Sequence, residues 1–166
     1  MDQRFEHTLV VIRHAKSDWA VDVDDRRRPL AKRGCRQAPA TGRWLGQQGF
    51  TLDLAVVSPA VRARQTWELV SAQLDGPPPT QVEEAAYTFD GEDLMEVLRG
   101  LPAQARGVVL VGHNPAVEEL VETLTGEYAA LPTSALAVLH VPEWGTLGPG
   151  TCRLVANLRP ADDETP

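Results

Sequence analysis

The sequence predicts an α/β fold: a three-layer sandwich with a mostly parallel central sheet, helices on both faces and an antiparallel edge strand. Short aliphatic runs alternate with stretches of helical length, which is the pattern of strand–helix–strand units. The early runs are apolar at every position, as expected for parallel strands covered on both faces. The last two runs are joined by PEWGTLGPG, which is short enough for a hairpin and so indicates an antiparallel edge.

Five aliphatic runs are expected to be strands, because each is rich in Val, Leu, Ile or Ala. They cover Leu9–Ile12, Leu54–Val57, Val108–Val111, Ala135–Val141 and Leu154–Leu158. The first three lack polar alternation and are therefore expected to form the buried, parallel part of the sheet.

Four stretches between these runs are expected to be helices. They run from Leu30 to about Gln48, from Pro59 to Leu74, from Glu92 to Leu101 and from Pro115 to Leu124. The first contains Pro39, which removes a backbone hydrogen bond and often kinks a helix. The second begins at a proline, which the first turn of a helix tolerates.

The chain has 166 residues, of which 43% are hydrophobic, and is expected to form one domain over residues 1–158 with a solvated acidic tail at 159–166. Its net charge of -7 argues against nucleic-acid binding and against attraction to anionic membranes. The first apolar run ends at Ile12, too early for a signal sequence or a membrane span. Cys35 and Cys152 have no CxxC spacing, so we expect free thiols and a cytoplasmic location.

Arginine and histidine side chains follow the first three predicted strands. Arg13 and His14 come directly after the first, Arg62 lies in the first turn after the second, and His113 follows the third. The carboxyl ends of parallel strands share one edge of the sheet, and open α/β folds bind ligands there. We therefore expect these four side chains to meet in one pocket.

Two guanidinium groups and two imidazoles in one pocket favour phosphoryl transfer. Guanidinium groups stay charged and offer forked donors that match phosphate oxygens. Helix amino termini near Pro59 and Pro115 add backbone donors for an anion. A neutral imidazole is a nucleophile, and nearby positive charges should depress its pKa. The pattern predicts transfer through a phosphohistidine, with no metal or cofactor and with phosphate or sulfate as the expected bound ion.

Plainer interpretations of individual residues remain open. The Arg13–His14 pair can be a solvent-exposed strand end, and His113 can be a turn residue in GHNP. A zinc site is conceivable, but no HxxE, HxH or Cys spacing supports it, and no GK[ST] loop indicates ATP binding. The run DVDDRRRP, with arginines at 26–28, is expected to be a solvated loop, with a contribution to substrate docking as the alternative. Trp19 is expected in the core, with the pocket mouth as the alternative.

Four motifs resemble those of the histidine phosphatase superfamily, which also contains the phosphoglycerate mutases. They are RHAKSDW, RPLAKRG, SPAVRARQT and VGHNP, and they occur in order between Val10 and about Leu124. The RHAKS and RPLxxRG forms are similar to those of the short branch, the SixA-like phosphohistidine phosphatases. Many members of the superfamily have glycine where this chain has Ala15. The RHAKS subgroup also has alanine there.

The resemblance implies that His14 accepts the phosphoryl group, while Arg13, Arg62 and His113 bind its oxygens. Residues beside the motifs that are candidates for further phosphate contacts are Lys16, Ser17 and Asn114. Arg28 in RPL also matches the family, in a role that can be structural.

The larger members of this family place an acidic general acid after the second strand region, and here its position is not clear. The candidates are Glu83, Glu84 and Asp90, of which Glu84 is preferred. A leaving imidazole can be protonated by solvent near neutral pH, whereas an alkoxide needs a positioned acid. The unclear acid therefore favours phosphohistidine, or another good leaving group, as the substrate.

The sequence therefore predicts a metal-independent phosphatase that acts on a phosphorylated histidine of a protein. A small phosphomonoester is the alternative substrate, because the same site would serve it. The short chain leaves little sequence for lids that enclose small metabolites, which favours the protein. An inactive phosphate-recognition module is a third hypothesis, and the presence of His14 argues against it because a pure binder gains nothing from a nucleophile.

Overall fold

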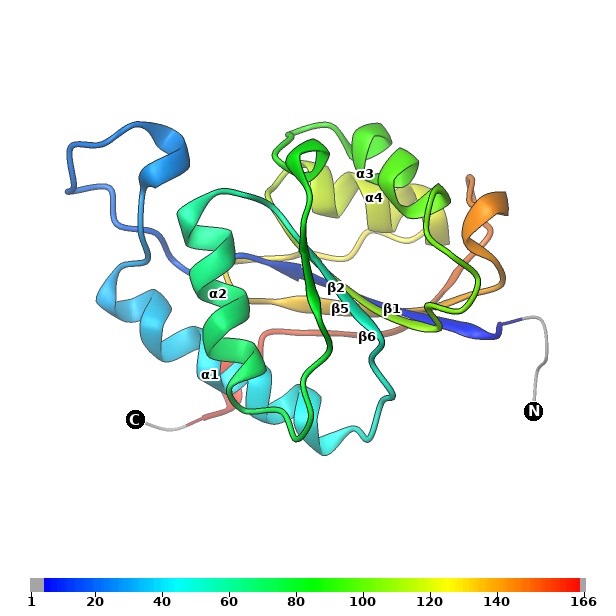
Figure 1. Ribbon diagram of the computed structural model, residues 1–166, viewed down its shortest axis with the longest axis horizontal. Helices are drawn as coiled ribbons and strands as arrows, with labels where there is room; N and C mark the ends of the chain where they lie inside the picture. The colour runs from blue at the N-terminus through cyan, green and yellow to red at the C-terminus, as the bar shows by residue number, and fades with distance from the viewer. Residues whose placement is uncertain (1–4, 165–166) are drawn as a thin grey trace.

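The structure, a computed structural model, describes residues 5–164 and contains one six-stranded sheet with helices on both faces (Figure 1). The strands are β1 (His7–Arg13), β2 (Leu54–Val57), β3 (Thr80–Val82), β4 (Gly107–Gly112), β5 (Leu136–Val141) and β6 (Arg153–Leu158). The helices are α1 (Lys32–Gln47), α2 (Val61–Ser71), α3 (Gly91–Arg99) and α4 (Ala116–Thr125), with short 3₁₀ helices η1 (Asp25–Arg27), η2 (Glu84–Ala86), η3 (Trp144–Thr146) and η4 (Pro160–Asp163). The predicted α/β class is confirmed.

The strands lie in the order β3-β2-β4-β1-β5-β6. Strands β1 to β4 run parallel to their neighbours among themselves, whereas β5 is antiparallel to both β1 and β6. The predicted antiparallel edge is therefore confirmed, and β5 is the strand that runs against its two neighbours. Leu136, the first residue of β5, pairs with Ile12 near the end of β1. The start of β5 thus lies at the edge where β1 and β4 end.

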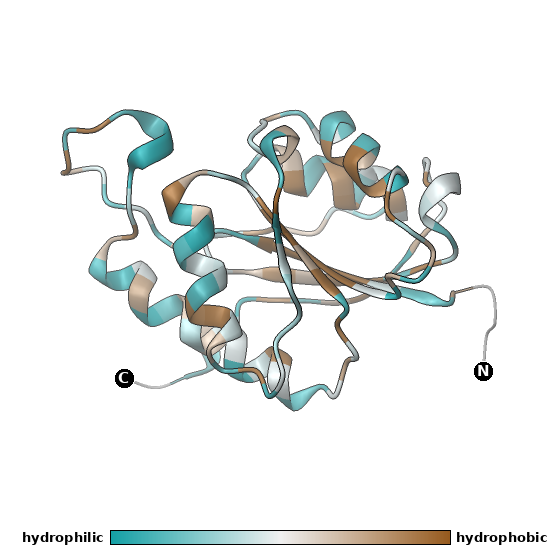
Figure 2. Ribbon diagram, in the orientation of Figure 1, coloured by the Kyte–Doolittle hydropathy of each residue, from teal (hydrophilic) through white to brown (hydrophobic). Residues whose placement is uncertain are grey.

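The sheet separates two hydrophobic cores. Helices α1 and α2 cover one face and helices α3 and α4 the other (Figure 1). Successive side chains of a strand point to opposite faces, so Val10 packs into the core under α1 and α2 while Leu9 packs into the core under α3 and α4. Figure 2 shows hydrophobic residues concentrated in the central strands. Strand β4 is buried at every residue, which explains why its sequence has no polar alternation.

Two local features differ from the sequence prediction. Strand β3 was not predicted, because its three residues, TQV, are all exposed at the edge of the sheet and form no apolar run. Pro39 lies inside α1, yet the helix continues to Gln47. Ala38 and Ala40 on either side of it are buried, and this packing offsets the hydrogen bond that the proline removes.

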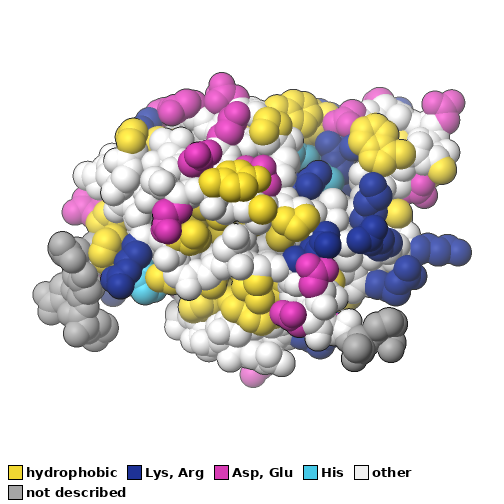
Figure 3. All heavy atoms as spheres, turned by 180° about the vertical axis from the view of Figure 1, so that it is seen from behind, with side chains coloured by type: hydrophobic (Ala, Val, Ile, Leu, Met, Phe, Trp, Pro, Cys, Tyr) yellow, Lys and Arg dark blue, Asp and Glu magenta, His cyan; other side chains and the backbone are white. Residues whose placement is uncertain are grey.

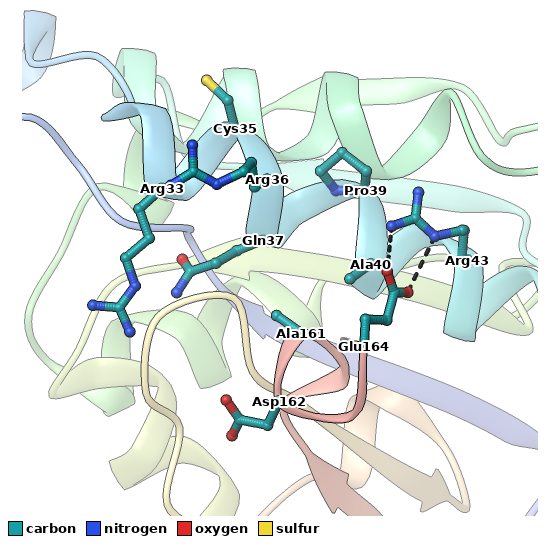
Figure 4. A pocket seen from close by; sticks show the side chains of 10 residues that line it. All are labelled: Arg33, Cys35, Arg36, Gln37, Pro39, Ala40, Arg43, Ala161, Asp162 and Glu164. Carbon is teal, nitrogen blue, oxygen red and sulfur yellow. Dashed lines mark hydrogen bonds and ion pairs between the residues drawn. The ribbon is translucent and has the colours of Figure 1, made fainter. Parts of the chain in front are cut away.

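The described part of the predicted acidic tail exposes its acidic residues, Asp162, Asp163 and Glu164, but also contacts α1. Pro160 is buried at the start of η4, and Glu164 accepts a hydrogen bond of 3.1 Å from Arg43 Nε of α1. Residues 165–166 lie outside the described residues. Figure 4 shows this segment against α1, where the two form the walls of a cavity of about 660 Å³. None of the predicted site residues lines that cavity, so it is separate from the pocket at the strand ends.

Cys35 and Cys152 are both free, as expected. In the part of the chain that the structure describes, no helix has the length and apolar character that crossing a membrane requires.

Candidate active site

The structure brings the four predicted residues around one pocket of about 200 Å³. Arg13 ends β1 and His14 follows it, Arg62 is the second residue of α2, and His113 follows β4. The ring centroids of His14 and His113 are 5.1 Å apart. Arg62 Nε lies 3.3 Å from Nε2 of His14. Side chains from three strand ends therefore share one site, as their positions in the chain predicted.

The pairing of β1 with β4 explains this meeting. Arg13 is in register with Gly112, so His14 and His113 leave adjacent strands at the same level. The loop after β1 is also tied to α2, because the Ala15 amide donates to Thr66 Oγ1 at 2.9 Å. Thr66 lies one turn beyond Arg62 on α2. This hydrogen bond therefore fixes the loop that carries His14 against the helix that carries Arg62.

His14 is held in the tautomer that leaves Nε2 unprotonated. Its Nδ1 lies 2.7 Å from the carbonyl oxygen of Ala15, and a carbonyl oxygen only accepts, so Nδ1 carries the proton. Burial, and to a smaller degree the charges of His113 and Arg62, lower the pKa of His14 to about 3 against the opposing effect of the Ala15 hydrogen bond. Nε2 is therefore unprotonated at neutral pH, and its lone pair accepts the hydrogen bond from Arg62 Nε.

His113 is buried beside the same pocket, and its Nε2 lies 2.7 Å from Ser58 Oγ. Burial, followed by the charge of Arg62, lowers the pKa of His113 to about 4. Within residues 5–164, His113 Nδ1 and Arg13 Nε are buried atoms with no hydrogen-bond partner. Buried polar groups are normally paired, and a phosphoryl oxygen in the pocket is an acceptor that the Arg13 Nε donor requires.

Asp25 is a pocket residue that the sequence did not single out. Its Oδ2 accepts from Arg62 Nη2 at 2.9 Å and from the Tyr87 hydroxyl, and its Oδ1 accepts from Arg28 Nη1 at 2.6 Å. Burial raises the pKa of Asp25, but the hydrogen bonds from Tyr87, Arg28 and Arg62 together hold it well below its usual range. Asp25 is therefore ionised and orients both guanidinium groups.

The three further phosphate-contact candidates, Lys16, Ser17 and Asn114, all line the pocket. Ser17 is buried and accepts a hydrogen bond of 3.0 Å from Arg28 Nε. Asn114 Nδ2 donates to the Leu131 carbonyl oxygen at 2.8 Å. The orientation of Arg28 and of Asn114 is thus set by these hydrogen bonds.

Glu84, the preferred general-acid candidate, lies outside the pocket lining. It is exposed on η2 and forms an ion pair with Arg26. The hydrogen bond from Arg26 lowers the pKa of Glu84, which is opposite to what a general acid needs at neutral pH. Glu83 and Asp90 use their carboxylates to cap η2 and α3. None of the three candidates is therefore placed as an acid at the reaction centre.

The expectation that Trp19 belongs to the core is wrong. Its side chain is 71% exposed and lies at the pocket, with the Arg28 guanidinium carbon 3.6 Å from its ring centroid. Stacking on a buried guanidinium holds the indole at the surface.

Among the described residues, no group of three or more His, Cys, Asp or Glu side chains is arranged to hold a metal ion.

The free energy of unfolding should fall as the pH is lowered from about 6.5 to about 4. In this range the unfolded chain protonates His14 and His113, whereas the folded protein does not, because their pKa values are lowered to about 3 and about 4. Stability is therefore lost as pH falls, by up to about 1.4 kcal/mol per pH unit for each imidazole. Urea unfolding at a series of pH values measures this slope. His14→Gln should reduce the slope of the unfolding free energy against pH. His140→Gln is the control and should not reduce it, because His140 lies outside the pocket lining. An unchanged slope in His14→Gln would contradict the prediction.

Comparisons with known proteins agree with this geometry. The family model "Histidine phosphatase superfamily (branch 1)" matches residues 9–86. Phosphohistidine phosphatase SixA of Escherichia coli is 32% identical over 142 residues, which cover 82% of this chain and 87% of that protein. The chain belongs to the histidine phosphatase superfamily. Within this superfamily it is similar to the SixA-like members, as the RHAKS motif predicted.

Two further comparisons cover most of the chain. An uncharacterized protein of Mycobacterium tuberculosis is 33% identical over 156 residues, covering 87% of this chain and 96% of that protein. The solved structure of the protein histidine phosphatase SixA complexed with tungstate has a TM-score of 0.82 and 26% identity, and the match covers 95% of this chain and 99% of that one. Membership in the histidine phosphatase superfamily supports a phosphatase activity for this protein.

Proposed function

We propose that this protein removes the phosphoryl group from a phosphorylated histidine of a protein, through a covalent phosphohistidine at His14 and without a metal. The observation that carries the proposal is the state of the His14 imidazole: Nδ1 is bound to the Ala15 carbonyl, and Nε2 is unprotonated 3.3 Å from Arg62 Nε. A neutral nucleophile beside a fixed cation is what attack on an anionic phosphoryl group requires.

In the first step the Nε2 lone pair of His14 attacks phosphorus. The bond from phosphorus to the substrate nitrogen breaks, its electron pair stays on that nitrogen, and the leaving imidazole takes a proton from solvent. Arg13 and Arg62 balance the charge on the phosphoryl oxygens. In the second step a water oxygen attacks phosphorus and loses a proton to solvent, while Nε2 of His14 leaves with the electron pair of its bond to phosphorus. Inorganic phosphate and neutral His14 are the products.

The size of the pocket favours a protein over an enclosed metabolite. Its volume of about 200 Å³ is below the roughly 300–1,000 Å³ of sites that enclose a small-molecule ligand. A phosphoryl group fits inside while the rest of the substrate stays at the surface.

Figure 3 shows Lys and Arg side chains gathered on one side of the molecule, which supports an anionic phosphorylated partner. Two free cysteines also fit a reducing compartment, and we place the protein in the cytoplasm.

The test compares three substrates: a phosphohistidine peptide, an aryl phosphate and a phosphoglycerate. The peptide should be hydrolysed with the highest kcat/KM and the phosphoglycerate with the lowest, because no acid is placed to protonate an alkoxide. A chelator should leave these rates unchanged, since guanidinium groups supply the positive charge. Preference for the phosphoglycerate would assign a small phosphomonoester as the substrate, and phosphate binding without turnover would assign a recognition module.

A further inference from the structure

Two exposed aromatic side chains stand at the catalytic pocket. Trp19 is 71% exposed and Phe89 is 56% exposed, and both line the cavity that holds His14. Of the seven large hydrophobic residues that are exposed among the described residues, Trp19 and Phe89 line this pocket. Exposed apolar side chains that gather in one place mark a binding surface, whereas scattered ones need no explanation.

Trp19 is fixed in position by the pocket wall. The Arg28 guanidinium lies 3.6 Å from its ring centroid. Arg28 is itself buried and is held by Ser17 Oγ at 3.0 Å and by Asp25 Oδ1 at 2.6 Å. The indole is therefore pre-positioned, with most of its surface open to a ligand.

Phe89 stands next to the catalytic imidazoles. Its ring centroid lies 6.2 Å from that of His113, with an angle of 63° between the planes, and His113 in turn lies 5.1 Å from His14. Phe89 is half exposed, whereas His113 and His14 are buried. The phenyl ring thus borders the outer part of the pocket whose inner part holds the nucleophile.

The direction of phosphoryl transfer connects these rings to the leaving group. Attack and departure are roughly in line, so the leaving atom lies on the side of phosphorus opposite to the attacking nitrogen. His14 is buried at the inner end of the pocket, and the leaving group must therefore point outward. Trp19 and Phe89 are the exposed aromatic side chains of the pocket lining on that outward path.

We propose that Trp19 and Phe89 form a binding site for a planar leaving group, the imidazole ring of the phosphorylated histidine. This inference rests on the proposed function and adds the element that selects the substrate. Aromatic side chains interact favourably with other flat π-systems in stacked or edge-to-face arrangements. The alkoxide of an alkyl phosphate has no such surface. The pocket would therefore distinguish leaving groups by shape, in addition to their need for an acid.

The experiment uses two small substrates that share the phosphoryl group and the bond that breaks. Monophosphoimidazole and phosphoramidate both break a P–N bond, but the first releases a planar ring and the second releases ammonia. The ratio of their kcat/KM values isolates recognition of the ring. Phe89→Leu keeps apolar volume without a ring and should lower this ratio by about tenfold, and Trp19→Leu should lower it in the same direction. Phe89→Tyr keeps the ring and should preserve the ratio.

Tyr128→Leu is the matched control, because Tyr128 is 65% exposed and is not part of the pocket lining. It should keep the wild-type ratio. The inference is overturned if Phe89→Leu leaves the ratio unchanged, which includes the case in which it lowers both kcat/KM values by the same factor. Those outcomes differ from failure of the proposed function itself, in which the wild-type protein hydrolyses neither substrate.

Discussion

Replacing His14 with alanine should lower kcat for a phosphohistidine peptide by a factor on the order of 10⁴ to 10⁶. The substitution removes the Nε2 lone pair that attacks phosphorus. His113 is the one other histidine in the described pocket lining. Nε2 of His113 lies 2.7 Å from Ser58 Oγ, a shorter contact than the 3.3 Å between His14 Nε2 and Arg62 Nε, and we expect His113 not to replace His14 as the nucleophile. Phosphate release from the peptide under single-turnover and steady-state conditions measures the loss.

Two controls separate lost chemistry from lost structure. His140→Ala removes a half-buried imidazole of β5 outside the pocket lining and should keep the wild-type rate. His14→Ala should still bind tungstate, since Arg13 and Arg62 remain. A phosphorylated peptide carrying radiolabelled phosphorus should label the wild-type protein but not His14→Ala. Turnover by His14→Ala within tenfold of the wild type would disprove the covalent mechanism.

Replacing Arg62 with lysine should lower kcat/KM by about 10²- to 10³-fold. The guanidinium makes three contacts, with His14 Nε2 at 3.3 Å, the Asp25 carbonyl oxygen at 2.6 Å and Asp25 Oδ2 at 2.9 Å. A lysine ammonium keeps the charge but cannot reproduce this planar fork. The loss therefore measures the geometry of the guanidinium and not only its charge. Steady-state kinetics with the phosphohistidine peptide provide the measurement.

Arg64→Lys is the matched control for this substitution. Arg64 lies two residues further along α2, where its side chain is exposed, so the same chemical change there should leave kcat/KM unchanged. Arg62→Lys that retains full activity would show that charge alone is sufficient and would contradict the role given to the fork.

The fold and the meeting of the four site residues could be predicted because they depend on local patterns. Aliphatic runs identified the buried strands, and parallel pairing requires residues after β1 and β4 to leave the sheet together. Arg13 and His113 were therefore placed by topology, without knowledge of any side-chain contact. The edge strand β3 could not be predicted in this way, because an exposed three-residue strand such as TQV carries no apolar signal.

The part of the site formed by loops could not be predicted. Asp25 lies in the run DVDDRRRP, where neighbouring aspartates have the same local pattern, and only contacts across space with Arg62 and Tyr87 distinguish it. Trp19 was expected in the core because a large aromatic residue is usually buried. Its stacking on Arg28 offers an alternative partner at the surface that sequence spacing does not reveal.

The reversed direction of β5 has a consequence for the wall of the pocket. Helix α4 starts just after His113 and ends beside Cys152, near the start of β6 and so at the opposite edge of the sheet, from which a parallel strand could have started directly. Because β5 instead starts at the catalytic edge, the connection from α4 has to return to the pocket, and Leu131 and Thr133 on that connection lie at Arg13 and at the pocket wall. The reversal of one strand thus adds a further segment to the wall around the reaction centre.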